Sequence, residues 1–235
     1  MSDGAGRPAA NAGTAQADPA STTALPTDWL QRLRDGLLRA PEHRREYWRV
    51  GGTGIMPTAD MLATLTGEPV AAAVLVPLLM ADGEPHVLLT ERSPHLSHHA
   101  GQISFPGGRV EAADAAPLDA ALRETAEEIG VPPEYFTPLG YLPDHIVLTG
   151  FRITPVVAQL QGGYPLRVDA REVAAVLTVP LRVVCDLSLY QRSSRQLRGG
   201  FTVETHELPV GERLVWGATA GMLLSLRALL CDAAP

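Results

Sequence analysis

Three glutamates, Glu124, Glu127 and Glu128, are the residues whose types and spacing most clearly indicate chemistry in this chain. They stand at relative positions i, i+3 and i+4, which share one face of an α-helix. Like charges at such positions repel one another by roughly 0.2–0.5 kcal/mol per pair. A hard cation turns this repulsion into attraction, because Mg²⁺ and Mn²⁺ prefer carboxylate oxygens. The pattern therefore predicts a divalent metal site on a helix.

The helix that must carry these glutamates is marked at both ends. Asp114 is a candidate N-cap, and Pro117 suits the first turn of a helix. Gly130 suits the left-handed position that follows a helix, and two prolines come directly after it. On the helical wheel, an apolar stripe lies roughly 140° away from the glutamates, so that one side can pack on a sheet. This stripe consists of Leu118, Leu122 and Ile129.

A glycine pair stands shortly before the helix. Gly107 and Gly108 let the main chain approach a ligand closely, and the Gly108 carbonyl is a candidate metal ligand. Arg123 lies four residues before Glu127 and can pair with it, which would orient that carboxylate. An acidic helix face alone is more often simply solvated. Its combination with the glycine pair and Arg123 favours the metal site.

These residues resemble the Nudix box, G-x5-E-x7-R-E-U-x-E-E-x-G-U, in which U is aliphatic. Gly108, Asp114 and Arg123 occupy its landmarks, with one extra residue in the loop and Asp in place of Glu. Thr125 stands where an aliphatic residue is common. The resemblance implies an α/β fold, a Nudix-type α/β/α sandwich with a mixed sheet. It also implies a hydrolase of phosphoric anhydrides that uses Mg²⁺ or Mn²⁺ held by the three glutamates and Gly108.

Residues 88–108 indicate a resemblance to one branch of this family. They are similar to the signature LLTxRSxxLRxHxGxxxFPGG of the coenzyme A diphosphatase branch, with Ser97 where that branch usually has Arg. This implies hydrolysis of coenzyme A, or its acyl or oxidised forms, to 3′,5′-ADP and (acyl-)4′-phosphopantetheine. Two alternatives stay open. One is a Nudix diphosphatase acting on ADP-ribose or another nucleoside diphosphate derivative, and the other is a non-catalytic nucleotide sensor.

Further site residues follow from this resemblance and from charge. Glu172 is the candidate general base, because its segment resembles the place where Nudix enzymes carry a distal acid, and Asp169 is the reserve. The expected catalytic set is Glu124, Glu127, Glu128, Arg123 and Glu172. The expected substrate-binding set is Arg92, His99, Gly107, Gly108 and Arg152, with the arginines between 192 and 198 as further phosphate ligands.

Composition restricts the partners and the compartment. A net charge of −7 argues against unaided binding of nucleic acid and favours metal ions as the means of attracting a diphosphate. Cys185 and Cys231 have no zinc-site spacing and do not make a disulfide framework, so each is interpreted as a small core residue. No run of 18 apolar residues and no leader pattern appear, so we expect a cytoplasmic protein without a membrane partner. Homodimers are common among relatives, and pairing with a second copy stays open.

The chain divides into three parts. Residues 1–26 are rich in Ala, Gly, Pro, Ser and Thr and predict a disordered tail. Residues 27–68 predict a helical extension, and residues 69–235 predict one Nudix hydrolase domain. Predicted elements are helices at 29–38, 60–66 and 217–230, strands at 70–80, 86–90, 137–142 and 153–159, a strand or turn at 172–179, and a hairpin over 189–203.

Overall fold

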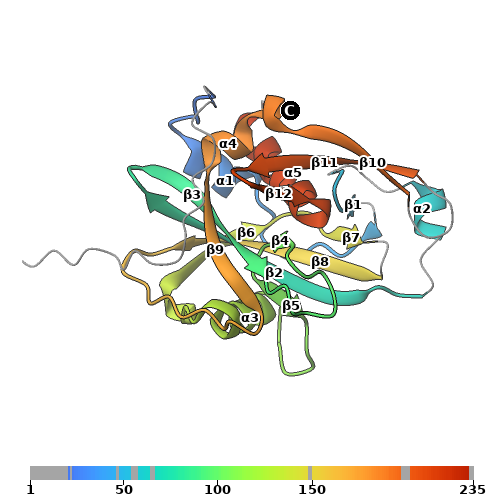
Figure 1. Ribbon diagram of the computed structural model, residues 1–235, viewed down its shortest axis with the longest axis horizontal. Helices are drawn as coiled ribbons and strands as arrows, with labels where there is room; N and C mark the ends of the chain where they lie inside the picture. The colour runs from blue at the N-terminus through green and yellow to red at the C-terminus, as the bar shows by residue number, and fades with distance from the viewer. Residues whose placement is uncertain are drawn as a thin grey trace, which may run out of the picture.

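A mixed sheet of nine strands organises the described part of the chain (Figure 1). The structure is a computed structural model that describes residues 21, 23–45, 48–53, 58–63, 67–147, 150–196 and 202–232. Most of the predicted tail lies outside the described residues. The nine strands are β1 (Arg49–Val50), β2 (Val70–Ala81), β3 (Glu84–Arg92), β4 (Ile103–Ser104), β5 (Gly107–Arg109), β6 (Phe136–Tyr141), β7 (His145–Val147), β8 (Phe151–Leu160) and β9 (Val173–Pro180).

The central strand β2 is a continuous apolar run because both faces of the sheet are covered. Parallel pairing joins β2 to β8 and β1 to β7, whereas antiparallel pairing joins β2 to β3 and to β5. Strand β6 pairs with β8, and β9 pairs with β3. The predicted mixed α/β fold is therefore confirmed. The segment 172–179, predicted as a strand or turn, forms the strand β9.

Helices cover the sheet on its two faces, as Figure 1 shows. On one face lies α3 (Pro117–Ile129), which packs on β2 and β5. On the other face lie α1 (Trp29–Gly36), α4 (Leu181–Cys185) and α5 (Gly217–Cys231). A short helix, α2 (Ala59–Ala63), replaces the predicted 60–66 helix, and residues 64–66 lie outside the described part. In the described part of the chain, no helix is long and apolar enough to cross a membrane. The cytoplasmic location stays a prediction.

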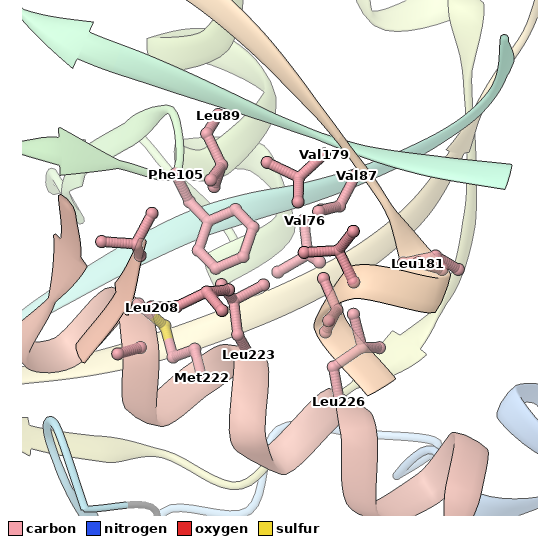
Figure 2. Close-up of a cluster of buried hydrophobic side chains, with 14 of the residues drawn as sticks. Val76, Val87, Leu89, Phe105, Val179, Leu181, Leu208, Met222, Leu223 and Leu226 are labelled. Carbon is pink, nitrogen blue, oxygen red and sulfur yellow. The ribbon is translucent and has the colours of Figure 1, made fainter. Parts of the chain in front are cut away.

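Two hydrophobic cores correspond to the two faces. The larger core lies under α5 and joins side chains of the sheet to Leu223 and Leu226 (Figure 2). Phe105, from the loop between β4 and β5, also points into this core. The smaller core lies under α3 and contains Ala120 and Ile129. The predicted apolar stripe of α3 is turned by about one residue, since Leu118 and Leu122 are only partly buried.

The C-terminal region adds a second sheet of three strands. Its strands are β10 (Gln191–Gln196), β11 (Thr202–Val210) and β12 (Arg213–Trp216), and α5 follows directly. The predicted hairpin over 189–203 is present as β10 and β11, although the first strand starts two residues later. Arg192 is exposed on β10, whereas Arg198 and the side chain of Arg195 lie outside the described residues.

Three sequence-based expectations were wrong. Residues 27–68 were expected to be helical, but within them Arg49 and Val50 form the strand β1 beside β7. Asp114 is not the N-cap of α3, because Ala116 takes that position. Cys185 and Cys231 are joined in a disulfide between the ends of α4 and α5, with their Cα atoms 6.4 Å apart. They are 46 residues apart in sequence, so only the packing of the two helices brings them together.

Candidate active site

Glu124 of α3 and Gly108 of β5 are in direct contact. A Cβ atom built on Gly108 would overlap the Glu124 carboxyl group. Gly107 has a φ of +148°, and a Cβ there would overlap the Ala73 carbonyl oxygen of β2. The glycine pair is therefore required because the backbone is held between β2 and the acidic face of α3.

Glu128 is the most buried of the three glutamates, with 3% of its surface exposed. The Gly107 amide donates a hydrogen bond to its Oε2 at 3.3 Å, and Arg92 Nη1 lies 3.8 Å from its Oε1. Burial raises the pKa of Glu128 to about 8, and the nearby negative charges of Glu172 and Glu124 act in the same direction. Arg92 and the Gly107 amide partly oppose this rise.

Arg123 connects the helix to the loop before it. Its guanidinium donates to both oxygens of Asp114, at 3.2 and 3.0 Å, and to Glu124 Oε1 at 2.8 Å. Its Nη2 also donates to the Arg109 carbonyl oxygen at 3.1 Å. The predicted pairing with Glu127 is present but longer, at 3.6 Å. Hydrogen bonds to Asp114 and Glu124 raise the pKa of Arg123, so it stays charged and holds both segments.

The acidic face fits a divalent cation in its donor chemistry. Glu124, Glu127, Glu128 and the Gly108 carbonyl supply hard oxygen ligands on two elements packed against each other. The burial of Glu128 close to two like charges is the strain that a divalent cation would relieve. In the described residues, no three acidic, histidine or cysteine side chains already converge as a cation cage. Glu124 is turned toward Arg123, and the Glu127 side chain is 61% exposed.

Glu172 lies beside the buried carboxylate, just before β9. The loop that carries it docks on the end of α3, where the Asp169 amide donates to the Glu128 carbonyl oxygen at 2.9 Å. The Glu172 carbonyl oxygen accepts from the Ser93 amide at 2.7 Å. Asp169 itself pairs with Arg171 at 2.6 Å, and these hydrogen bonds lower its pKa to about 2. Of the two predicted general bases, Glu172 is therefore the one whose charge acts on Glu128.

A cavity of about 500 Å³ adjoins the glycine pair, between the main sheet and α5. Its walls are mostly apolar, and no acidic side chain is found among the described residues that line it. The aromatic part of the wall comes from Phe105, Phe151 and Trp216. The wall also contains basic and polar side chains, among them Arg92, His99, Gln102 and Arg109. This composition suits a ligand that is apolar over much of its length and also carries anionic groups.

Two predicted substrate-binding side chains, Arg92 and His99, line this cavity. Arg92 Nε is buried and has no hydrogen-bond partner in the part of the chain that the structure describes. His99 adopts a φ of +57°, and its Nδ1 lies 2.9 Å from the side-chain oxygen of Gln102. Both side chains therefore lie where they could contact a phosphate group.

Arg152, the remaining predicted substrate ligand, is placed elsewhere. It alternates along β8 with Phe151 and Ile153, which line the cavity, and it is not one of the lining residues. Its Nε lies 3.5 Å from Asp144, a carboxylate that is 1% exposed and also contacts His43 at 2.8 Å. Burial raises the pKa of Asp144. The structure thus gives Arg152 a buried acidic partner outside the cavity.

Arg109 and Phe151 were not among the site residues predicted from the sequence. The Arg109 guanidinium lies over the Phe151 ring, 5.5 Å from its centroid, at the cavity wall. The sequence position of Arg109, directly after the glycine pair on a strand, could have predicted its orientation. Side chains alternate along a strand, so Arg109 lies on the side opposite Gly108. Its stacking on Phe151 could not be foreseen, since the two residues are 42 positions apart in the sequence.

Comparison with known protein families shows to which family this chain belongs. Residues 69–195 match the family described as NUDIX domain. The chain belongs to the Nudix family. The Uncharacterized Nudix hydrolase NudL of Escherichia coli (strain K12) is 39% identical over 158 residues, covering 66% of this chain and 80% of NudL. The protein is thus a Nudix hydrolase, an enzyme acting on phosphoric anhydrides, and Nudix hydrolases generally use ions such as Mg²⁺ or Mn²⁺.

Solved Nudix structures also resemble this chain. The crystal structure of a Nudix hydrolase from M. smegmatis, RenU, is 27% identical, with a TM-score of 0.43, covering 52% of this chain and 76% of RenU. The NUDIX domain of Shewanella oneidensis NrtR, solved as a complex with ADP ribose, is 23% identical, with a TM-score of 0.39, covering 54% of this chain and 84% of that domain.

Proposed function

We propose that this Nudix hydrolase cleaves the diphosphate bond of coenzyme A, or of its acyl or oxidised forms, to 3′,5′-ADP and (acyl-)4′-phosphopantetheine. The proposal rests on the position in the fold of residues 88–108, the segment that resembles the coenzyme A branch. Its side chains from Arg92, His99, Gln102 and Phe105 line one cavity that adjoins the glycine pair. Gly107 and Gly108 complete that wall and contact the glutamates.

The shape and polarity of the cavity support a substrate of this kind. Coenzyme A carries its diphosphate between a nucleotide and a long pantetheine arm. A mostly apolar cavity of about 500 Å³ has room for one such flanking group. Arg92, His99 and Gln102, which line the same cavity, then meet the anionic centre of the substrate. This pairs the apolar part of the ligand with the apolar wall and the diphosphate with the acidic helix and its metal ions.

Metal ions would be held by Glu124, Glu127, Glu128 and the Gly108 carbonyl. When bound, they would neutralise the diphosphate and lower the pKa of a coordinated water. Arg123 acts as a positioning residue, because it holds the Glu124 carboxylate and the loop that ends at Asp114. Arg92, whose Nε has no hydrogen-bond partner among the described residues, would donate to a phosphate oxygen.

Glu172 is the group that we propose to accept the proton of the attacking water. The water oxygen bonds to one phosphorus, and the bond from that phosphorus to the bridging oxygen breaks. Water is thereby divided between the two products, and no other reactant is needed. A positioned general base typically contributes about 10²–10⁴-fold in rate. Glu172 is suited to this role because it lies next to Glu128 in an exposed loop that a substrate can reach.

The decisive assay incubates the purified protein with coenzyme A and Mg²⁺ or Mn²⁺ and follows 4′-phosphopantetheine by mass spectrometry. ADP-ribose and a dinucleoside polyphosphate at the same concentration serve as competing substrates. We expect coenzyme A to have the highest kcat/KM and EDTA to abolish its turnover. A higher kcat/KM for ADP-ribose would replace the proposal by the other diphosphatase class. Absence of turnover on every substrate would favour the nucleotide sensor.

Two variants distinguish a specific role of the acidic helix in catalysis from a general effect of removing one negative charge. Glu128→Gln should lower kcat by more than about 100-fold, whereas Glu134→Gln, at an exposed position, should leave kcat unchanged. Isothermal titration of Mn²⁺ should show weaker binding to Glu128→Gln only. Equal activity of the two variants would remove α3 from the mechanism.

A further inference from the structure

A second basic group lies at the cavity, apart from the acidic helix. Arg109 is the last residue of β5, and it lines the cavity together with Phe151. Its neighbour Gly108 faces Glu124, so strand alternation directs the Arg109 side chain to the opposite side of β5. Arg109 is therefore separated from the oxygen ligands that would hold the metal ions, although only one residue divides the two groups.

The guanidinium of Arg109 is held in place but not neutralised. Its contact with the Phe151 ring, at 5.5 Å, restricts its orientation. Its main chain is tied to Arg123 by the hydrogen bond to its carbonyl oxygen. Within the described residues, no salt bridge is formed by the Arg109 side chain, whereas Arg123 and Arg213 each have a carboxylate partner within 3.0 Å. An oriented, unpaired arginine on an exposed wall is suited to bind a phosphate group of a ligand.

We infer that Arg109 is a specificity-determining residue that binds the 3′-phosphate of the substrate ribose, with Phe151 as its support. This inference rests on the proposed function. In the proposed function, the metal ions and Arg92 bind the diphosphate on the side of β5 that faces the acidic helix. Coenzyme A carries one phosphate besides the diphosphate. An arginine on the other side of β5, in the wall of the same cavity, meets this additional phosphate. The residue thereby distinguishes coenzyme A from 3′-dephospho-coenzyme A.

Steady-state kinetics with these two substrates tests the assignment, because they differ only in the group that Arg109 would bind. Arg109→Ala should raise the KM for coenzyme A about tenfold while kcat stays within about twofold, as expected for loss of uniform binding. The KM for 3′-dephospho-coenzyme A should not change. Phe151→Leu should shift the coenzyme A KM in the same direction by a smaller factor. Arg34→Ala removes an equal charge from the exposed side of α1 and should change neither substrate.

The outcomes separate this inference from the proposed function. Equal loss on both substrates would place Arg109 at the diphosphate and overturn the inference, as would a coenzyme A KM unchanged by Arg109→Ala. In either case the wild-type protein would still hydrolyse coenzyme A, and the proposed function would stand. A wild-type protein that turns over neither substrate would overturn both. Circular dichroism and thermal melting of Arg109→Ala and Phe151→Leu show whether a raised KM belongs to a folded enzyme.

Discussion

The Glu124 carboxyl group occupies the space that a side chain on Gly108 would need. This contact joins the strand that is to offer a main-chain carbonyl to the helix that is to offer the carboxylates. It therefore sets the spacing between the proposed metal ligands. An atom added at Gly108 must displace either the strand or the glutamate.

Gly108→Ala tests this contact. We expect kcat/KM to fall by about 100-fold, because a displacement near 1 Å at reacting groups has costs of this order. Overpacking should lower the free energy of unfolding by about 1–3 kcal/mol. Gly162→Ala is the matched control, because a Cβ there meets no atom within 4 Å. Kinetics and urea unfolding of both variants provide the measurement, and similar activity of the two would show that the contact is dispensable.

Arg123→Lys should separate charge from geometry. Lysine keeps the positive charge but cannot reproduce the fork that contacts Asp114 and Glu124 together. We expect kcat to fall about tenfold or more, with Mn²⁺ affinity reduced in isothermal titration. Asp114→Asn should cause a loss of the same kind, and the double variant should be little worse than either single one. Fully additive losses would mean that the two residues act independently.

The Cys185–Cys231 disulfide should stabilise the fold. It closes a loop of 46 residues that contains the second sheet and α5, and loop-closure entropy predicts about 4 kcal/mol for that length. Urea unfolding with and without dithiothreitol measures the effect, and reduction should move the midpoint to lower urea. The Cys185→Ser/Cys231→Ser protein should be insensitive to dithiothreitol. A wild-type midpoint that reduction leaves unchanged would contradict the stabilising role.

His145 should make the fold less stable in acid. Burial, together with the nearby positive charge of Arg49, lowers the pKa of this residue from 6.5 to about 3. Below pH 6.5 the unfolded chain binds a proton at this residue and the folded chain does not. The contribution of His145 to the free energy of unfolding is therefore fully present above that pH and declines as pH falls toward 3. At pH 5 the loss from this residue is about 2 kcal/mol.

Urea unfolding between pH 7.5 and 5 measures this contribution. His145→Gln removes the titrating ring and should flatten the pH dependence relative to the wild-type protein, although its stability at neutral pH falls because the contact with Ser225 Oγ, 3.1 Å from Nε2, is lost. His98→Gln, at an exposed loop position, should keep the wild-type pH dependence. A His145→Gln curve parallel to that of the wild type would assign the acid sensitivity to other groups.

Features that depend on neighbours in the sequence could be predicted well. Helix α3 starts at Pro117 and ends before Gly130, whose φ of +69° is the left-handed conformation expected there. The run from Val70 forms the buried central strand. Spacing of three and four residues also placed the glutamates on one helix. Such features follow from the chain sequence because their hydrogen bonds and steric limits act over a few residues.

Relations across the fold were decided only by packing. Asp114 was predicted to cap a helix, but the docking of β5 on α3 brings it to Arg123 instead. The two cysteines were predicted to be separate core residues, but the packing of α4 against α5 joins them in a disulfide. Arg109 and Arg152 are both arginines on strands near the site, yet one faces the cavity and the other a buried aspartate. Which face of a sheet a side chain meets depends on register and on the helices that cover it, and these contacts form between segments that the sequence holds far apart.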